Sequence, residues 1–237
     1  MSFLSGNRRS SRDEEMLFDD PYTRRIFISK VLMIVAINLL FTVLVMTFCI
    51  FHSGARHFLI RHWYIGLIGT AVIFIISIIM CFCIGLFRKS PYKYILLVIY
   101  VIAHAALVAC CAVRYYPKLV FIAVAVCAGI VILLGLFARF APCDFTGCCI
   151  FLFVLSIVVL IMGILSLFFP ILRIVYVALG VLLFSVYIVV DLQMLIGGKT
   201  HKNQFDESDF ILAAMFLYSD IIFLFIFLLE LIGLIDS

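Results

Sequence analysis

Five ionisable side chains interrupt the long apolar stretches of this sequence and are the first candidates for chemistry. They are Lys30, His104, Asp191, Asp220 and Glu230. An ionisable group at the centre of a bilayer costs roughly 2.5–3.5 kcal/mol on insertion scales, so such a residue marks a functional site by default. Lys30 is the weakest of these candidates, because it lies about one helical turn inside its stretch and its long side chain can reach the membrane surface.

His104 and Glu230 are candidates for titrating groups on a pathway through the membrane. His104 lies near the middle of the third apolar stretch, where it is either a neutral histidine hydrogen-bonded between helices or a group that takes up and releases protons. Glu230 lies near the end of the last stretch, where its carboxylate can also reach water. Residue type and position leave both interpretations open.

Asp191 and Asp220 form the strongest candidate site. One polar connection joins the two apolar stretches that contain them, so the predicted helices are antiparallel neighbours and the carboxylates can meet inside the bundle. From Asn203 near the centre of this connection, Asp191 lies 12 residues back and Asp220 lies 17 residues forward. The difference of five residues corresponds to about 7 Å of helix rise, which the connection has to absorb.

A pair of carboxylates has a specific chemistry when it is held in a medium of low dielectric. The two groups cannot both ionise cheaply at close range, so they share one proton and titrate as a pair. Such a pair can sense pH, relay protons or bind a hard cation such as Ca²⁺ transiently through its oxygens. The alternative is a structural hydrogen bond between a carboxyl group and a carboxylate, which locks two helices together.

The composition places these residues in a membrane protein. Hydrophobic residues make up 67% of the 237 residues and charged residues 13%, against about 25% charged residues in an average soluble domain. A soluble domain of this length cannot hide so much apolar surface, because a folded protein still needs a polar shell. The composition excludes an ordinary cytosolic enzyme, a nucleic-acid binder and a disordered regulator, and it makes membrane lipids the first partners.

Seven apolar stretches are each long enough to cross about 30 Å of hydrocarbon as a helix. They span residues 27–51, 64–87, 94–113, 118–138, 148–169, 171–196 and 209–233. Pro170 divides an apolar run that is far too long for one crossing, and a polar loop from His52 to His62 separates the first two stretches. The predicted fold is all-α: a polytopic membrane protein with a seven-transmembrane helical bundle.

The ends of the stretches predict domain organisation and orientation. Residues 1–25 form a mixed-charge tail that we expect to be disordered, and residues 26–237 form a single transmembrane domain. Twelve lysines and arginines fall on the side of the N-terminus and five on the opposite side. Because positive charges concentrate in the cytosol, the N-terminus is predicted to be cytosolic. With seven crossings the C-terminus lies on the other side of the membrane.

The C-terminal part of the chain carries a motif around both aspartates. The motif runs Asp191-Leu192-Gln193, then Ile196-Gly197-Gly198, then Leu217-Tyr218-Ser219-Asp220-Ile221-Ile222. It resembles the signature of the transmembrane Bax inhibitor motif family, and most closely its Lifeguard branch. Segments 25–31 and 88–91 are also similar to the first-helix entry and the basic, proline-marked turn of this family. The resemblance is strong over residues 191–226 and weaker, but in order, over residues 24–190.

This resemblance implies a function. The family comprises proteins of intracellular membranes that let calcium leak from stores and suppress cell death, and an aspartate pair in the last two helices acts as their pH-sensitive gate. Asp191 and Asp220 occupy these motif positions. The resemblance therefore implies a non-enzymatic channel with Ca²⁺ as the permeant ion and no cofactor. It implies the endoplasmic reticulum or Golgi, with the plasma membrane as an alternative, and cell-death regulatory membrane proteins as partners.

The chain departs from the family pattern at several positions. Leu192, Ser219, Phe223 and Lys93 replace threonine, leucine, asparagine and asparagine, and His104 stands where relatives often have glutamate. Residues 64–86 contain no arginine, so an arginine latch in the second helix cannot be transferred to this chain. The aspartate pair is intact, while conductance and selectivity do not follow from the motif.

Two other functional classes remain open. One is a non-conducting membrane scaffold that regulates cell death by binding partners, and the other is a proton-coupled transporter, although no inverted repeat is evident. An intramembrane aspartyl protease would need Gly-x-Gly before one aspartate, whereas Leu217-Tyr218-Ser219 precedes Asp220. Cys148 and Cys149 lie beside the membrane on the predicted cytosolic side, where palmitoylation is a candidate modification.

Overall fold

The protein is a helical bundle. The computed structural model describes residues 21–82, 91–141, 143–197, 205 and 207–236. These residues form eight α-helices and two short 3₁₀ helices and contain no β-strand. The helices are α2 (Pro21–Phe51), α3 (Ser53–Arg61), α4 (Tyr64–Phe82), α6 (Tyr92–Ala112), α7 (Pro117–Phe140), α8 (Cys149–Phe168), α9 (Leu172–Ile196) and α10 (Phe210–Ile235), with η1 (Phe145–Gly147) and η2 (Glu207–Asp209).

The prediction of seven membrane spans is confirmed. Among the described helices, all except α3 are long and apolar enough to cross a membrane. The predicted break at Pro170 is also confirmed, because α8 ends at Phe168 and α9 begins at Leu172. Phe169 before the proline adopts an extended conformation, which proline favours in the residue that precedes it and which ends α8.

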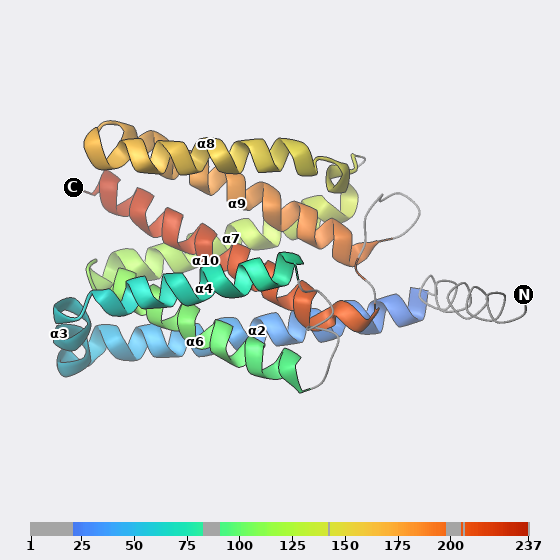
Figure 1. Cartoon of the computed structure of the whole chain (residues 1–237), viewed down its shortest axis with the longest axis horizontal. Coiled ribbons are helices and arrows are strands. Elements are labelled where there is room, and N and C mark those ends of the chain that lie inside the picture. The colour runs from blue at the N-terminus through green and yellow to red at the C-terminus, as the bar shows by residue number, and fades with distance from the viewer. Residues whose placement is uncertain (1–20, 83–90, 142, 198–204, 206, 237) are drawn as a thin grey trace, which may run out of the picture.

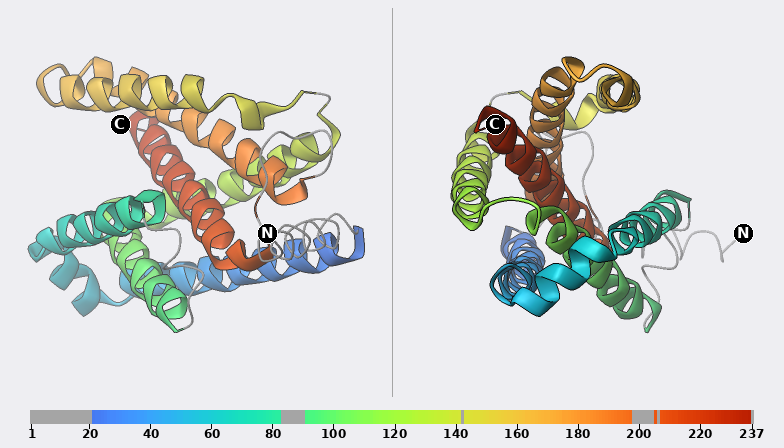
Figure 2. Two further views of the ribbon diagram at one scale, coloured as in Figure 1. Left: turned by 45° about the vertical axis from the view of Figure 1, so that its right-hand side comes forward. Right: turned by 90° about the vertical axis from the view of Figure 1, so that its left-hand side faces the viewer.

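Helix α10 lies at the centre of the bundle (Figure 1). It packs against α9, α7, α2 and α6, and 78% of its most apolar window is buried inside the protein, against 11% for α8. Helix α8 lies at the edge, where it packs on α9, as the two further views in Figure 2 show. The large apolar residues that remain exposed on the outer helices therefore face lipid.

Different helix ends lie at the two ends of the bundle. The start of α2, the end of α9 and the start of α10 lie at one end, and α3 and the end of α10 lie at the other (Figure 1). The described chain therefore begins and ends at opposite ends of the bundle, as an odd number of crossings requires. We call the end that contains α3 the α3 end.

Small residues bring α4 and α6 close together. A Cβ atom on Gly69 would lie 2.9 Å from the carbonyl oxygen of Ala103, so only glycine fits at this crossing. Ala103, Ala105 and Ala109 are all buried on α6. Close packing of small residues is the usual way in which membrane helices associate, and here it fixes α6, the helix that carries His104.

Two predicted boundaries differ from the structure. The polar loop between the first two spans is wrong for residues 53–61, which form α3. This helix is too short and too polar to show as an apolar stretch, and all its residues stay at least partly exposed. Helix α2 begins at Pro21, inside the predicted tail, while residues 1–20, the turn at 88–90 and most of the last connection lie outside the described residues.

Candidate functional site

The structure brings the two candidate aspartates together. Asp191 lies on α9, five residues before the helix ends, and Asp220 lies ten residues into α10. Their side chains reach each other and interact directly as a pair. Asp191 is only 8% exposed, and its Oδ2 atom is buried without a hydrogen-bond partner in the described part of the chain. A buried carboxylate oxygen without a hydrogen-bond partner is costly. Protonation removes the negative charge and lowers this cost, so such a group is suited to exchanging a proton.

Apolar residues surround the pair along both helices. Val189 and Val190 are buried beside Asp191, and Ile221 and Ile222 are buried beside Asp220. Such neighbours keep the local dielectric low, so electrostatic interactions between the two carboxyl groups are strong. The environment is the one that the chemistry of a shared proton requires.

Tyr100 on α6 forms the polar border of this site. Its side chain is buried, faces Ser77 and Ser219, and lies within electrostatic range of both aspartates. Ser219 donates its own hydroxyl proton to the carbonyl of Phe216 at 3.0 Å. The pair therefore adjoins a small group of hydroxyl side chains contributed by α4, α6 and α10.

His104 lies close to this group but not in the pair. It is fully buried, and its ring packs against Tyr100, Tyr218 and Phe223 with centroid distances of 4.3, 5.2 and 5.7 Å. Its Nδ1 atom lies 3.0 Å from the carbonyl oxygen of Tyr100. Because a carbonyl can only accept, Nδ1 carries the proton, and Nε2 has no hydrogen-bond partner in the described part of the chain.

A hydrogen-bond chain connects α10 to α2 next to the pair. Thr42 donates to the carbonyl oxygen of Asn38 at 2.9 Å, and its hydroxyl oxygen lies 2.8 Å from that of Tyr218. Since Thr42 has one proton and gives it to Asn38, Tyr218 donates to Thr42. Tyr218 precedes Asp220 by two residues, so this bond fixes the part of α10 that presents the carboxylate.

Arg24 holds the end of α9. In the sequence this arginine contributes only to the prediction of membrane orientation. Its guanidinium donates to the carbonyl oxygens of Met194, Leu195 and Ile196 at 2.8–3.1 Å and to that of Phe205 at 3.3 Å. The last carbonyls of a helix lack partners within the helix and carry partial negative charge, so a cation is favoured there. No local signal reveals this contact, because about 170 residues separate its partners.

Gln193 fixes the same end of α9 from another side. Its Oε1 atom accepts a hydrogen bond from the backbone N–H of Phe145 at 2.8 Å, and its Nε2 donates to the carbonyl of Cys143 at 2.9 Å. Gln193 is completely buried. This side chain belongs to the motif around Asp191, and its position explains why an amide, with both a donor and an acceptor, suits that place.

Glu230 lies far from the pair, at the α3 end. Its Oε1 atom forms an ion pair with Nε of Arg173 at 2.7 Å, which joins the end of α10 to the start of α9. Cys148 is exposed beside η1, and the side chain of Cys149 lies outside the described residues. In the described part of the chain no three His, Cys, Asp or Glu residues gather where they could hold a metal ion.

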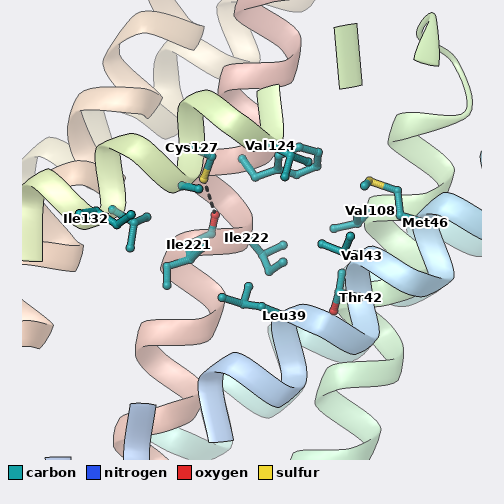
Figure 3. Close-up of a pocket in the computed structure, with 13 residues that line it drawn as sticks. Leu39, Thr42, Val43, Met46, Val108, Val124, Cys127, Ile132, Ile221 and Ile222 are labelled. Atoms are coloured by element: carbon teal, nitrogen blue, oxygen red, sulfur yellow. Dashed lines mark hydrogen bonds between the residues drawn. The ribbon is translucent and has the colours of Figure 1, made fainter. Parts of the chain in front are cut away.

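An apolar cavity of about 330 Å³ lies between α2, α6, α7 and α10 (Figure 3). Ile221 and Ile222, which follow Asp220, form part of its wall, and Cys127 on α7 points its sulfur toward the carbonyl of Ile221 at 3.8 Å. Apart from the Thr42 hydroxyl and the sulfur atoms of Cys127 and Met46, its lining side chains are hydrocarbon. The cavity offers nothing that would coordinate an ion.

Comparisons with known proteins agree with the motif. Residues 24–237 match the family described as "Inhibitor of apoptosis-promoting Bax1". The chain is 31% identical to human "Protein lifeguard 3" over 222 residues, which cover 91% of this chain and 71% of that protein. It is 33% identical to "Protein LIFEGUARD 2" of Arabidopsis thaliana over 233 residues, which cover 94% of this chain and 93% of that protein.

Proposed function

The chain belongs to the family of inhibitors of apoptosis-promoting Bax1, and from this premise we propose that it is a calcium leak channel of intracellular membranes. Its opening depends on the protonation of Asp191 and Asp220, and its activity protects the cell against death. The single observation that carries this proposal is the direct contact between the buried carboxyl group of Asp191 and the partly buried one of Asp220. The matching family of inhibitors of apoptosis-promoting Bax1 and the lifeguard names of the relatives support the protective role.

The proposed gate is a two-state contact between α9 and α10. With one shared proton, one carboxyl group donates a hydrogen bond to the other and the helices are bridged. When the number of bound protons changes, this bridge changes, and the equilibrium between closed and open states shifts. We assign this structure to the closed state of the proposed gate, and the buried apolar residues beside the pair support that assignment.

The same carboxylates supply an attraction for the permeant ion. Ca²⁺ prefers oxygen ligands and takes six to eight of them, whereas two carboxylates provide four oxygens at most. Water has to complete the coordination shell, so the pair attracts Ca²⁺ transiently and does not store it. Such weak binding suits conduction, because an ion has to leave a site as readily as it enters.

The direct test is Ca²⁺ flux through purified protein in liposomes over a series of pH values. We expect a leak whose pH dependence is lost in Asp191→Asn and in Asp220→Asn. Asp236→Asn is the matched control, because it makes the same chemical change at an exposed carboxylate just after α10. Normal titration of the leak in either pair variant would place the gate elsewhere. No flux above empty liposomes from folded protein would favour the scaffold instead.

A further inference from the structure

A second cavity, distinct from the aspartate pair, opens at the α3 end of the bundle. Its volume is about 380 Å³, and α4, α6, α9 and α10 contribute its walls. A volume of this size lies within the usual range of small-molecule sites. The proposed gate does not use this cavity, so a ligand could occupy it whether or not the protein conducts calcium.

The cavity carries a positive charge without a counter-ion. Arg114 and Arg173 line it together with one carboxylate, Glu230. Glu230 is engaged by Arg173 at 2.7 Å, whereas the side chain of Arg114 makes neither a hydrogen bond nor an ion pair in the described part of the chain. Arg114 is therefore the group available to an incoming anion.

Neighbouring elements strengthen this charge. Arg56 on α3 donates to the carbonyl oxygen of Val113 at 3.2 Å, which brings a third guanidinium to the backbone next to Arg114. Residues 52–64 contain no acidic residue. Tyr115 also lines the cavity, and burial, together with nearby Glu230, raises the pKa of its phenol. The phenol consequently stays neutral and keeps a proton that it can donate to an anion.

The other walls of the cavity are mainly apolar. Leu67 is exposed on the outer surface of the bundle, whereas Leu107 and Leu229 line the cavity further inside. Trp63 is the kind of side chain that lies at a membrane surface. Trp63 and Tyr64 are both about half exposed, as expected for aromatic side chains at a membrane interface. A ligand that satisfies every wall has a negative headgroup for Arg114 and a hydrocarbon chain for the leucines.

We propose that this cavity binds one anionic phospholipid, with its phosphate on Arg114 and Tyr115 and an acyl chain along Leu67 and Leu107. The lipid is taken from the leaflet at the α3 end, since the cavity lies at the level of that interface. Cationic residues near a membrane surface attract anionic lipids, and here a cavity localises that attraction to one molecule.

Trp63 makes the proposal testable, because it is the only tryptophan in the chain and it lines the cavity. The protein is reconstituted in bilayers of phosphatidylcholine that contain increasing fractions of brominated phosphatidylglycerol or brominated phosphatidylcholine. Bromine quenches tryptophan fluorescence at short range. We expect half-maximal quenching at a mole fraction of phosphatidylglycerol about five- to tenfold lower than that of phosphatidylcholine.

Charge variants set the sign of the effect. Arg114→Gln should remove most of the preference for phosphatidylglycerol, and Glu230→Gln should increase it, because it removes the competing carboxylate. Lys118→Gln is the matched control, since Lys118 is an exposed cation at the same end that does not line the cavity. Circular dichroism verifies that each variant is folded.

Three results would overturn the proposal. Equal quenching by the two lipids would remove the selectivity, and an unchanged preference in Arg114→Gln would remove the site. Displacement of the brominated phosphatidylglycerol by inorganic phosphate in the buffer would show a simple anion site without a role for the acyl chain.

Discussion

At the scale of single residues, the site consists of a few polar side chains inside an apolar bundle. The aspartate pair, the Tyr218–Thr42 bond and the enclosed His104 lie in or beside α10. Each of these groups is held by a partner on another helix. Precise positioning matters for a shared proton, because a hydrogen bond between two carboxyl groups weakens steeply with distance and angle.

Tyr218→Phe tests how firmly α10 is held next to the pair. The substitution keeps the ring and removes the hydroxyl that donates to Thr42 at 2.8 Å. We expect the free energy of unfolding to fall by about 1 kcal/mol, the usual size of such a bond between membrane helices. Tyr116→Phe is the control, because Tyr116 is 74% exposed and should show no loss. Equal stability of both variants in a denaturant titration would contradict this account.

At the scale of elements, the contact between α9 and α10 is held at two levels. The aspartate pair joins the two helices towards one end of the bundle, and the ion pair between Arg173 and Glu230 joins them at the α3 end. Arg24 and Gln193 additionally fix the last turn of α9. Helix α9 is therefore held near both of its ends, and in the proposed gate a change in protonation of the pair acts on the part between them.

Arg24→Gln should loosen the last turn of α9. It removes the cation that satisfies carbonyl oxygens of Met194, Leu195 and Ile196, so we expect a loss of about 2 kcal/mol in the free energy of unfolding. Hydrogen exchange should become faster at the backbone amides next to this turn. Arg25→Gln removes a charge from the exposed neighbouring position and serves as the control. Equally slow hydrogen exchange at these amides in both variants would contradict the role of Arg24 in holding the last turn of α9.

Breaking the ion pair at the α3 end should have a small effect on stability. The side chain of Arg173 is 51% exposed and that of Glu230 is 22% exposed, so water and salt screen their attraction. We expect Arg173→Gln to cost less than about 1 kcal/mol in the free energy of unfolding, and the difference should shrink as ionic strength rises. A loss several times larger, or one insensitive to salt, would show instead that this ion pair contributes strongly to the stability of the bundle.

The elements also show what sequence can and cannot predict. The seven spans could be predicted because the length of an apolar stretch is a local property of the sequence. The break at Pro170 could be predicted because proline lacks the backbone N–H that a helix needs. The proximity of Asp191 and Asp220 followed from a single connection between neighbouring helices. The contacts of Arg24 and Gln193 could not be predicted, because their partners lie 170 and about 50 residues away in the chain. Helix α3 escaped because a short surface helix has no apolar stretch.

At the scale of the whole molecule, an odd number of crossings determines the topology. The described chain begins and ends at opposite ends of the bundle, as Figure 1 shows. The distribution of lysine and arginine predicts a cytosolic N-terminus. A glycosylation acceptor added after Ser237 should therefore be modified in cells, and one added before Met1 should not. Modification of the N-terminal tag alone would invert the predicted orientation.

The central claim is that the pair of aspartates makes the leak depend on pH. Asparagine is the neutral counterpart of a protonated aspartate with almost the same shape. The double variant Asp191→Asn/Asp220→Asn should therefore imitate the fully protonated pair. We predict that its Ca²⁺ flux in liposomes stays, at every pH, at the level that the unmodified protein reaches at the acid end of the series. A double variant that is folded and follows the pH curve of the unmodified protein would contradict this account.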